Sequence, residues 1–341
     1  MRDIVIVGAG FAGVSTAYHL ARRGVTGIQV LEREVGPGFH ASGKNAGLLR
    51  QSSHDPALVP LLRRGSRAAA KLLRRIPGAL RPCGSLILGA SVDRLRGGPR
   101  AEFRVLPELG ERGLFDPDDA VVDPMALLGA LIDGARRRGV RFVFEETVEG
   151  VSVENGRVVS VRTQARDIAA RGLVVAAGAW SAEVAALAGS AAIDLAVRRR
   201  HLFRGRLQPP RPGLPFVWHE SKGVYFRAEG EGMLLSPCDT ELHPAAPPQV
   251  DPAQRDVLAE RVQSAFGGLG EWSIGAGWAC LRTFAPDERF VIGPDPGVGG
   301  LFWVTGLGGH GMTAAWAVGR LAARVYLARE RNHAFDPARF L

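Results

Sequence analysis

The hydrophobic pattern at the start of the chain predicts a strand, a helix and a second strand. Residues 4–7 are a β-branched apolar run, and residues 14–23 have helical composition and end at Gly24. Residues 27–31 are a second apolar run, which ends at Glu32. Short apolar runs bounded by glycine favour buried strands, and strands that alternate with helices indicate an α/β fold.

The same pattern returns in the middle and near the end of the chain. An apolar run at 173–176 passes into small residues, and a run at 301–304 passes into a glycine loop and then a helix at 313–327. An amphipathic helix is expected at 123–138. Further strands are expected at 141–144, 158–162, 224–226 and 233–235, and proline-rich loops at 209–215 and 243–252.

Between the first strand and helix lies a glycine motif, Gly8-x-Gly10-x-x-Gly13. Gly8 permits the tight turn, Gly10 lets the backbone approach a pyrophosphate, and Gly13 lets helix and strand pack closely. The helix N-terminus offers N–H groups and a partial positive charge to phosphates, and Glu32 can accept hydrogen bonds from a ribose. The motif predicts a dinucleotide site, without choosing between nicotinamide and flavin.

Two further loops are rich in small residues. Residues 36–47 carry four glycines with serine and asparagine, which let backbone and hydroxyl groups approach a flat ligand. Residues 305–312 feed a helix and form a second possible anion site.

Composition narrows the class of protein. The chain has 341 residues and a net charge of +9, and only Lys44, Lys71 and Lys222 of its 43 basic residues are lysines. Its 40 arginines lie in scattered short groups without interleaved aromatics, so we expect a solvated surface and no nucleic-acid partner. No apolar run reaches the length of a membrane-spanning helix, and no secretory leader is visible, which favours a cytoplasmic protein.

The reactive residues do not form a metal site or a disulfide framework. The three cysteines are far apart with no CxxC pair, and no His, Asp or Glu cluster has metal-ligand spacing.

Six segments together resemble the D-amino-acid-oxidase-like family of FAD-dependent oxidoreductases, which includes glycine oxidase, monomeric sarcosine oxidase and bacterial D-amino-acid dehydrogenases. The resemblance spans essentially the whole chain, and the likeness to D-arginine dehydrogenase is strongest within the family. The segments are VGAGFAG at 7–13, LERE at 31–34, HASGKNAG at 40–47, VVAAGAWS at 174–181, WACLRTFAPDERFVIG at 278–293 and FWVTGLGGHGM at 302–312.

The resemblance implies two domains interleaved in sequence. A Rossmann-like FAD-binding domain would comprise residues 1–81, 120–191 and 279–341, and a mostly antiparallel β substrate-binding domain residues 82–119 and 192–278. It implies extended FAD, bound by Gly8, Gly10, Phe11, Ala12, Gly13, Glu32, Arg33, His40, Ser42, Lys44, Asn45, Ala46, Gly47, Leu48, Val148, Ala177, Gly178, Trp180, Gly308, Gly309, His310, Gly311, Met312 and Thr313.

The family's chemistry is hydride transfer from the substrate α-carbon to flavin N5, followed by hydrolysis of the imine. Such a reaction asks the protein mainly for orientation, and a guanidinium meets a carboxylate with two parallel hydrogen bonds. Arg282 matches the family's carboxylate-binding arginine, Tyr225 a tyrosine that helps to hold the same group, and Arg200 a further active-site arginine. His310 is a weaker candidate for acid–base catalysis.

The expected substrate pocket comprises Leu48, Arg50, Ser53, Ser85 and Cys280. Ser85 stands where the D-arginine dehydrogenase pattern has an acidic residue, which removes the reason to prefer a cationic substrate. We therefore expect a neutral D-amino acid, with oxygen, a quinone or a dye as electron acceptor. Cys280 matches the cysteine that bonds to flavin in monomeric sarcosine oxidase, although non-covalent FAD is favoured.

Two alternative functions remain open. The substrate could be a 2-hydroxy acid or a glycine- or sarcosine-like amine, or the chain could be a flavin-bearing subunit that needs a partner. Oligomeric state, stereochemistry and the choice between oxidase and dehydrogenase do not follow from the sequence.

Overall fold

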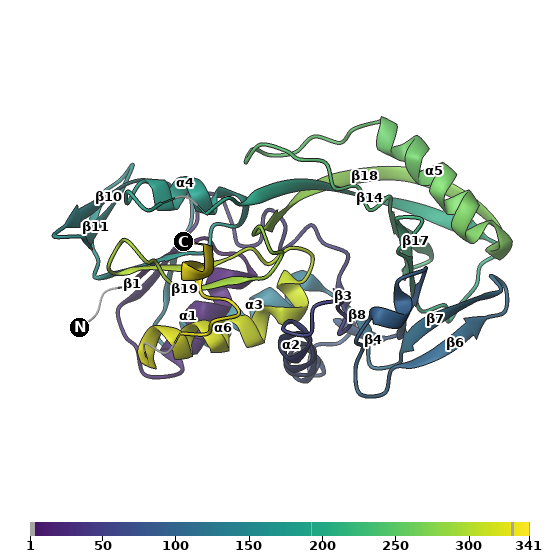
Figure 1. Cartoon of the computed structure of the whole chain (residues 1–341). Helices are drawn as coiled ribbons and strands as arrows, with labels where there is room; N and C mark the ends of the chain where they lie inside the picture. Colours follow the sequence, from purple (N-terminus) through teal and green to yellow (C-terminus); the bar gives the residue numbers. More distant parts are fainter. Residues whose placement is uncertain (1–3, 192, 329–330, 341) are drawn as a thin grey trace.

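The computed structural model describes residues 4–191, 193–328 and 331–340. Figure 1 shows a sheet flanked by helices at one end of the molecule and a large curved sheet at the other. The two long strands β14 (Ala196–Gln208) and β18 (Glu271–Phe284) extend from the middle of the molecule into the large sheet.

The first sheet has six strands in the order β19-β20-β13-β1-β2-β9. All neighbouring pairs are parallel except β19 and β20, which confirms the expected α/β class. Its strands are almost entirely buried, as apolar strands with both faces covered should be, except the edge strand β9, which is exposed or half-buried. They are β1 (Ile4–Val7), β2 (Ile28–Leu31), β9 (Arg141–Val143), β13 (Gly172–Val175), β19 (Val291–Pro294) and β20 (Leu301–Thr305).

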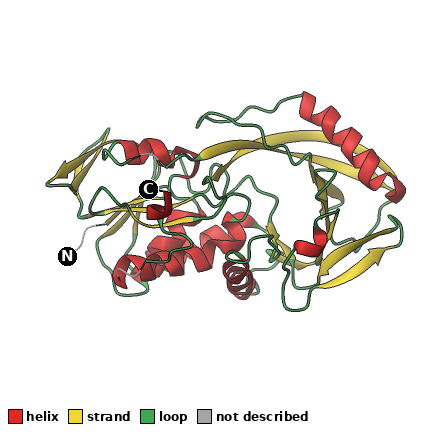
Figure 2. Ribbon diagram, in the orientation of Figure 1, coloured by secondary structure: helices red, strands yellow, loops and turns green. Residues whose placement is uncertain are grey.

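Helices α1 (Phe11–Ala21), α3 (Pro124–Arg136) and α6 (Gly311–Ala328) share one hydrophobic core with this sheet. The first helix begins three residues before the expected position, directly after Gly10. Asp123 caps α3, because its Oδ1 accepts hydrogen bonds from the backbone N–H groups of Met125 and Ala126. Figure 2 shows these helices together below the sheet.

Helix α2 (Val59–Leu73), which was not expected from the sequence, packs against α6. A Cβ at Gly65 would lie 2.0 Å from the carbonyl oxygen of Thr313, so only glycine lets the two backbones approach this closely.

The second large sheet has eight strands in the order β18-β14-β17-β16-β15-β5-β7-β6, antiparallel except between β15 and β5. Helix α5 (Ala253–Phe266), also not anticipated, packs against it through Leu258, Val262 and Phe266. The expected domain boundary at 278/279 falls inside strand β18. The remaining strands are β5 (Ser85–Leu88), β6 (Glu102–Leu106), β7 (Glu111–Asp116), β15 (Phe216–His219), β16 (Val224–Glu229) and β17 (Gly232–Ser236).

Two three-stranded sheets complete the described fold. Residues 158–162, expected as a strand, belong to a separate sheet of β10 (Val148–Glu154), β11 (Arg157–Thr163) and β12 (Asp167–Ala169). The other contains β3 (Leu48–Leu49), β8 (Ala120–Val122) and β4 (Leu80–Pro82). Short helical segments are α4 (Ser181–Ala186), Val92–Arg94, Gly178–Trp180, Gly267–Leu269 and Pro337–Phe340.

Candidate active site

A single cavity of about 490 Å³ is lined by residues of both large sheets. From the six-stranded sheet it takes the β1–α1 turn, the loop after β13 and the loop before α6. From the eight-stranded sheet it takes side chains of β14, β15, β16 and β18. The volume lies within the usual range for small-molecule sites.

One end of the cavity is formed by the glycine turn between β1 and α1. Gly8 has φ +108°, and a Cβ there would lie 2.5 Å from the carbonyl oxygen of Ala176. A Cβ at Gly13 would lie 2.0 Å from the carbonyl oxygen of Gly8. The turn therefore requires glycine at both positions, and it leaves the N-terminus of α1 beside the cavity.

Acidic and aromatic side chains form the wall next to this turn. Glu32 Oε2 accepts a hydrogen bond from the N–H of Ala9 at 2.8 Å, and Oε1 accepts one from the N–H of Glu34 at 3.1 Å. The guanidinium of Arg33 lies 3.8 Å from the centre of the Trp180 ring. His40 Nε2 lies 2.7 Å from Glu34 Oε1.

The second glycine loop is tied to the N-terminus of α6. Thr313 Oγ1 donates a hydrogen bond to the carbonyl oxygen of Leu48 at 3.0 Å, and the N–H of Arg50 lies 3.3 Å from Thr313 Oγ1. Asn45 stabilises the same loop, because its Nδ2 donates to the Ser42 carbonyl at 2.7 Å and its Oδ1 accepts from the Gly47 N–H at 2.8 Å.

These features fit FAD. The glycine turn at the start of α1 leaves room for a pyrophosphate, and the Glu32 carboxylate can accept hydrogen bonds from a ribose. The partial positive charge at the start of α6 would stabilise the electron-rich pyrimidine of a flavin. The residues that would hold the cofactor therefore come from both ends of the chain.

The other end of the cavity is rich in arginine. Arg200 on β14 lies opposite Cys280 on β18, and both side chains line the cavity with Arg282, two residues further along β18. Tyr225 on β16 also lines it and is 5% exposed. Burial raises the pKa of the Tyr225 phenol, so this residue is a hydrogen-bond donor at neutral pH.

Arg282 has no carboxylate partner among the described residues. Burial and the neighbouring Arg200 lower the pKa of the Arg282 guanidinium, which nevertheless stays charged in a protein. A Cβ at Gly309 would lie 3.2 Å from Nη1 of Arg282, so the loop before α6 contacts this arginine directly. The arrangement suits a bound carboxylate.

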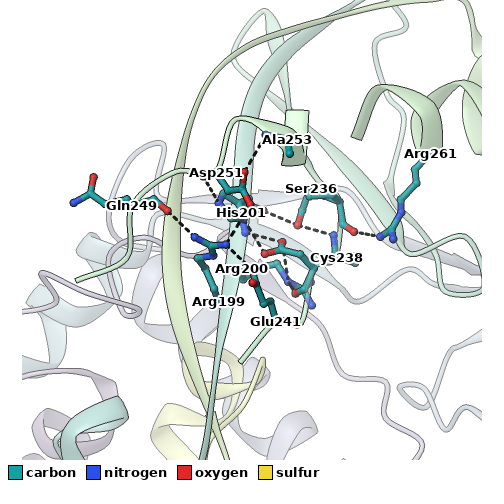
Figure 3. A network of polar contacts seen from close by, with 12 residues as sticks. Arg199, Arg200, His201, Ser236, Cys238, Glu241, Gln249, Asp251, Ala253 and Arg261 are labelled. Atoms are coloured by element: carbon teal, nitrogen blue, oxygen red, sulfur yellow. Dashed lines mark hydrogen bonds and ion pairs between the residues drawn. The ribbon is translucent and has the colours of Figure 1, made fainter. Parts of the chain in front are cut away.

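Arg200 is held by a polar network between β14 and residues 237–251, shown in Figure 3. Its Nε donates to the carbonyl oxygen of Asp239 at 2.8 Å. The Asp239 carboxylate contacts His201, whose Nε2 accepts a hydrogen bond from the N–H of Asp251 at 3.0 Å. Because Nε2 is an acceptor, His201 is the neutral Nδ1–H tautomer.

Two further groups lie at this end. Arg50 lies 4.8 Å from the centre of the Trp218 ring, and Arg50 Nη1 donates to Ser52 Oγ at 3.2 Å. Burial, together with Arg50 and Arg282, holds the pKa of His310 well below its usual range. His310 is therefore a neutral imidazole at physiological pH.

Most residues expected at the site line the cavity, including Arg282, Tyr225, Arg200, His310, Arg50 and Cys280. Five lie outside the lining: Gly13, Lys44, Gly47, Ser53 and Ser85. Gly13 supports helix packing, as expected, and Gly47 contacts the Val122 carbonyl. Ser85 donates to Asp119 Oδ2 at 2.7 Å, so its hydroxyl is used inside the protein.

Trp218 and Phe216 on β15 were not predicted from the sequence. They line the arginine-rich end of the cavity, which is the candidate substrate end. The segment FVWH is a short apolar run of the kind found in any buried strand, and only its pairing with β5 and β16 places it at the cavity. Glu146, Glu183 and Leu187 at the opposite end were not predicted either.

No group of three or more His, Cys, Asp or Glu side chains in the described parts of the chain is placed to hold a metal ion. No helix within those parts is long and apolar enough to cross a membrane.

Comparison with known proteins places this architecture in a family. The chain is 28% identical to FAD-dependent oxidoreductase domain-containing protein 1 of Bos taurus, over 95% of the chain and 81% of that protein. It is 26% identical to D-amino acid dehydrogenase of Cereibacter sphaeroides, over 94% of the chain and 90% of that enzyme. The crystal structure of L-proline dehydrogenase from P. horikoshii superposes with a TM-score of 0.88 at 21% identity, covering 99% of this chain and 97% of the other.

The chain spans only 39–42% of the length of several other relatives, which are mitochondrial dehydrogenases. The FAD dependent oxidoreductase (DAO) family model matches residues 3–325. The chain therefore belongs to the DAO family of FAD-dependent oxidoreductases, whose members include amino acid and amine dehydrogenases and oxidases.

Proposed function

We propose that the protein oxidises a D-amino acid at its α-carbon, as an FAD-dependent dehydrogenase or oxidase. The observation that carries this proposal is the position of Arg282 and Tyr225, which line the same cavity as the glycine turn but at its opposite end. A carboxylate bound there would leave its α-carbon facing the region between the two ends.

Arg282 supplies most of the binding. Its planar guanidinium can donate two parallel hydrogen bonds to the α-carboxylate, and the Tyr225 hydroxyl can donate a third. Because Arg282 has no carboxylate partner among the described residues, a substrate carboxylate does not have to displace one. Fixing the carboxylate fixes the α-carbon one bond away, which is the orientation that hydride transfer requires.

FAD held by the glycine turn and Glu32 would supply the acceptor for a hydride, that is, for two electrons and one proton from the substrate. The substrate's ammonium group first loses a proton to solvent, and the oxidised amine loses a second. The resulting imino acid adds water and releases ammonia to give a 2-oxo acid. Oxygen, a quinone or a dye then takes the two electrons.

The substrate end does not suit a cationic side chain. Its charged lining residues are arginines, and the nearby Asp119 is fully buried with a pKa raised to about 8 by burial and by Asp116. Asp119 is thus largely neutral at pH 7 and accepts hydrogen bonds from Ser85 and Gln51. A lysine- or arginine-like substrate would meet like charge without compensation.

We propose that the flavin is bound non-covalently. Burial raises the pKa of the Cys280 thiol, which leaves little of the thiolate that a covalent bond to flavin would need.

The test is anaerobic reduction of the purified holoenzyme by amino acids of both hands, followed by re-oxidation in air. We expect bleaching of the visible flavin absorption band by D-amino acids and not by their enantiomers or by 2-hydroxy acids. Rapid recovery in air would identify an oxidase, and slow recovery a dehydrogenase. Lack of bleaching by every amine would overturn the proposal.

A further inference from the structure

The substrate end of the cavity holds more positive charge than one α-carboxylate can neutralise. Arg50, Arg200 and Arg282 all line it. Arg200 already lies beside Asp239, 3.8 Å from Nε to Oδ1, whereas neither Arg50 nor Arg282 forms an ion pair with any described residue. Two unpaired guanidinium groups therefore share one cavity.

Such an arrangement is costly unless a ligand compensates for it. Placing two like charges in a partly desolvated cavity destabilises the folded protein, and an unpaired buried charge is among the more expensive features of a structure. In the proposed function, the α-carboxylate of the substrate neutralises the charge of Arg282. Arg50 forms no ion pair with either acidic residue near it, Asp119 or Glu220. Asp119 is largely neutral at pH 7, and the Glu220 carboxylate is already bonded to His54 and Ser91.

The surroundings of Arg50 are those of an anion site. The guanidinium lies over the Trp218 ring and has one neutral hydrogen-bond partner, Ser52. Its backbone is fixed by the hydrogen bond to Thr313 at the start of α6.

We propose that the substrate is an amino acid with a second carboxylate, which Arg50 binds while Arg282 and Tyr225 bind the α-carboxylate. The inference rests on the proposed function and replaces the expected neutral side chain with an anionic one. A neutral and an anionic side chain both remain compatible with the argument against a cationic substrate. The guanidinium stacked on an aromatic ring presents its edge to a carboxylate, a role that lysine fills poorly.

The test uses holoenzyme and ligands that carry no amine. Succinate and butyrate have four carbons each and differ in the second carboxylate. Their binding is titrated through the perturbation of the flavin absorption band and, independently, by calorimetry. We expect succinate to bind at least about 10-fold more tightly than butyrate, as a charge-assisted hydrogen-bond pair would give.

Variants then assign the difference to Arg50. In Arg50→Met the preference for succinate should disappear while butyrate affinity changes less than about threefold, and Arg50→Lys should recover only part of it. The matched control is Arg75→Met, which removes an exposed arginine and tests whether net charge alone attracts dianions. Equal binding of succinate and butyrate by the wild type, or an equal loss in Arg75→Met, would overturn the inference.

A parallel measurement separates this inference from the proposed function. Flavin reduction is compared for D-glutamate and D-norvaline, which have the same carbon chain. If both reduce the flavin at similar kcat/KM and Arg50→Met affects both equally, the second-carboxylate inference fails and the amino acid oxidation stands. If neither reduces the flavin but succinate is still preferred, the proposed function fails while the anion site stands.

Discussion

Nδ1 of His201 lies 2.8 Å from Oδ2 of Asp239, and the N–H of His201 donates to Oδ1 of the same carboxylate at 2.8 Å. Burial would raise the pKa of Asp239, but the hydrogen bonds from His201 hold it below its ordinary value. The ionised carboxylate lies beside Arg200, and the Asp239 carbonyl accepts from Arg200 Nε. His201 and Asp239 thus position Arg200 at the cavity without lining it themselves.

Asp239→Asn should weaken substrate binding through Arg200. Both Asp239 oxygens accept hydrogen bonds from His201, so the amide NH2 of asparagine would face one of these N–H donors. If His201 changed tautomer to accept from the NH2 group, its Nε2 would carry the proton and could no longer accept from the Asp251 N–H. We expect KM to rise about 10-fold, the scale of one hydrogen bond to a charged group, with FAD content unchanged. Glu241→Gln, which alters an exposed partner of Arg199 in the same network, is the control and should change KM less than about twofold.

Arg282→Lys should cost more than any other conservative change at the site. Lysine keeps the charge but loses the two parallel donors, so we expect kcat/KM to fall about 100-fold. Steady-state kinetics with the best substrate of the panel measures this, and flavin absorbance checks that the cofactor stays bound. A fall of less than about threefold would show that another group holds the α-carboxylate.

Gly10→Ala should separate folding from cofactor binding. The new Cβ would lie 2.9 Å from Ser42 Oγ, which can rotate away at the cost of the hydrogen bond that it accepts from the Phe11 N–H, so the fold should survive. The same methyl group would face the pyrophosphate, and we expect the ratio of flavin to protein absorbance to fall severalfold. Gly36→Ala, whose Cβ would meet nothing within 4 Å, is the matched control and should bind FAD normally. Equal FAD content in both variants would contradict the assigned role of Gly10.

The cofactor end of the cavity carries more local sequence signals than the arginine-rich end. The glycine turn, Glu32 and the loop before α6 are recognisable because each depends on local geometry: a tight turn, a strand end or a helix start. The strands at 4–7 and 301–304 also carry local signals: the first is a β-branched run followed by Gly8, and the second is an aliphatic and aromatic run preceded by Gly300. Such local signals can be recognised in the sequence without knowledge of the rest of the fold.

Residues at the substrate end meet only through long-range pairing. Trp218 lies on β15 and Arg50 directly follows β3, so the two side chains come from distant parts of the chain and no local pattern predicts their contact. Ser85 looked like a pocket residue, but its strand orients the hydroxyl toward Asp119 instead of the cavity. Helices α2 and α5 were not predicted, although their buried residues recur at helical spacing: Leu62, Ala69 and Leu73 in α2, and Leu258, Val262 and Phe266 in α5.

Cys280→Ser should leave the flavin bound and releasable. If FAD is held only by non-covalent contacts, acid precipitation of the wild type moves all yellow colour to the supernatant, and the serine variant behaves identically. Retention of colour in the wild-type pellet, and its loss in Cys280→Ser, would establish a covalent bond to this thiol.

The buried Asp119 predicts an unusual pH dependence of stability. The pKa of an aspartate in an unfolded chain is about 4. The pKa of Asp119 in the folded protein is raised to about 8, first by burial and then by Asp116. Between these values the folded protein keeps a proton that the unfolded chain releases. The contribution of Asp119 to the free energy of unfolding therefore falls as pH rises from about 4 to about 8.

Asp119→Asn removes this contribution, because asparagine imitates the protonated acid and can still accept from the Gln51 N–H. Relative to wild type, the variant should gain up to about 1.4 kcal/mol in the free energy of unfolding for each pH unit across this window. Urea unfolding at pH 5, 6, 7 and 8 with a fixed excess of FAD measures the difference. Asp118→Asn is the control, since the hydrogen bond from Arg100 lowers the pKa of Asp118 and confines its effect to acid pH. Curves for wild type and Asp119→Asn that stay parallel from pH 5 to pH 8 would show that Asp119 is ionised in the folded protein, and would restore a carboxylate partner to Arg50.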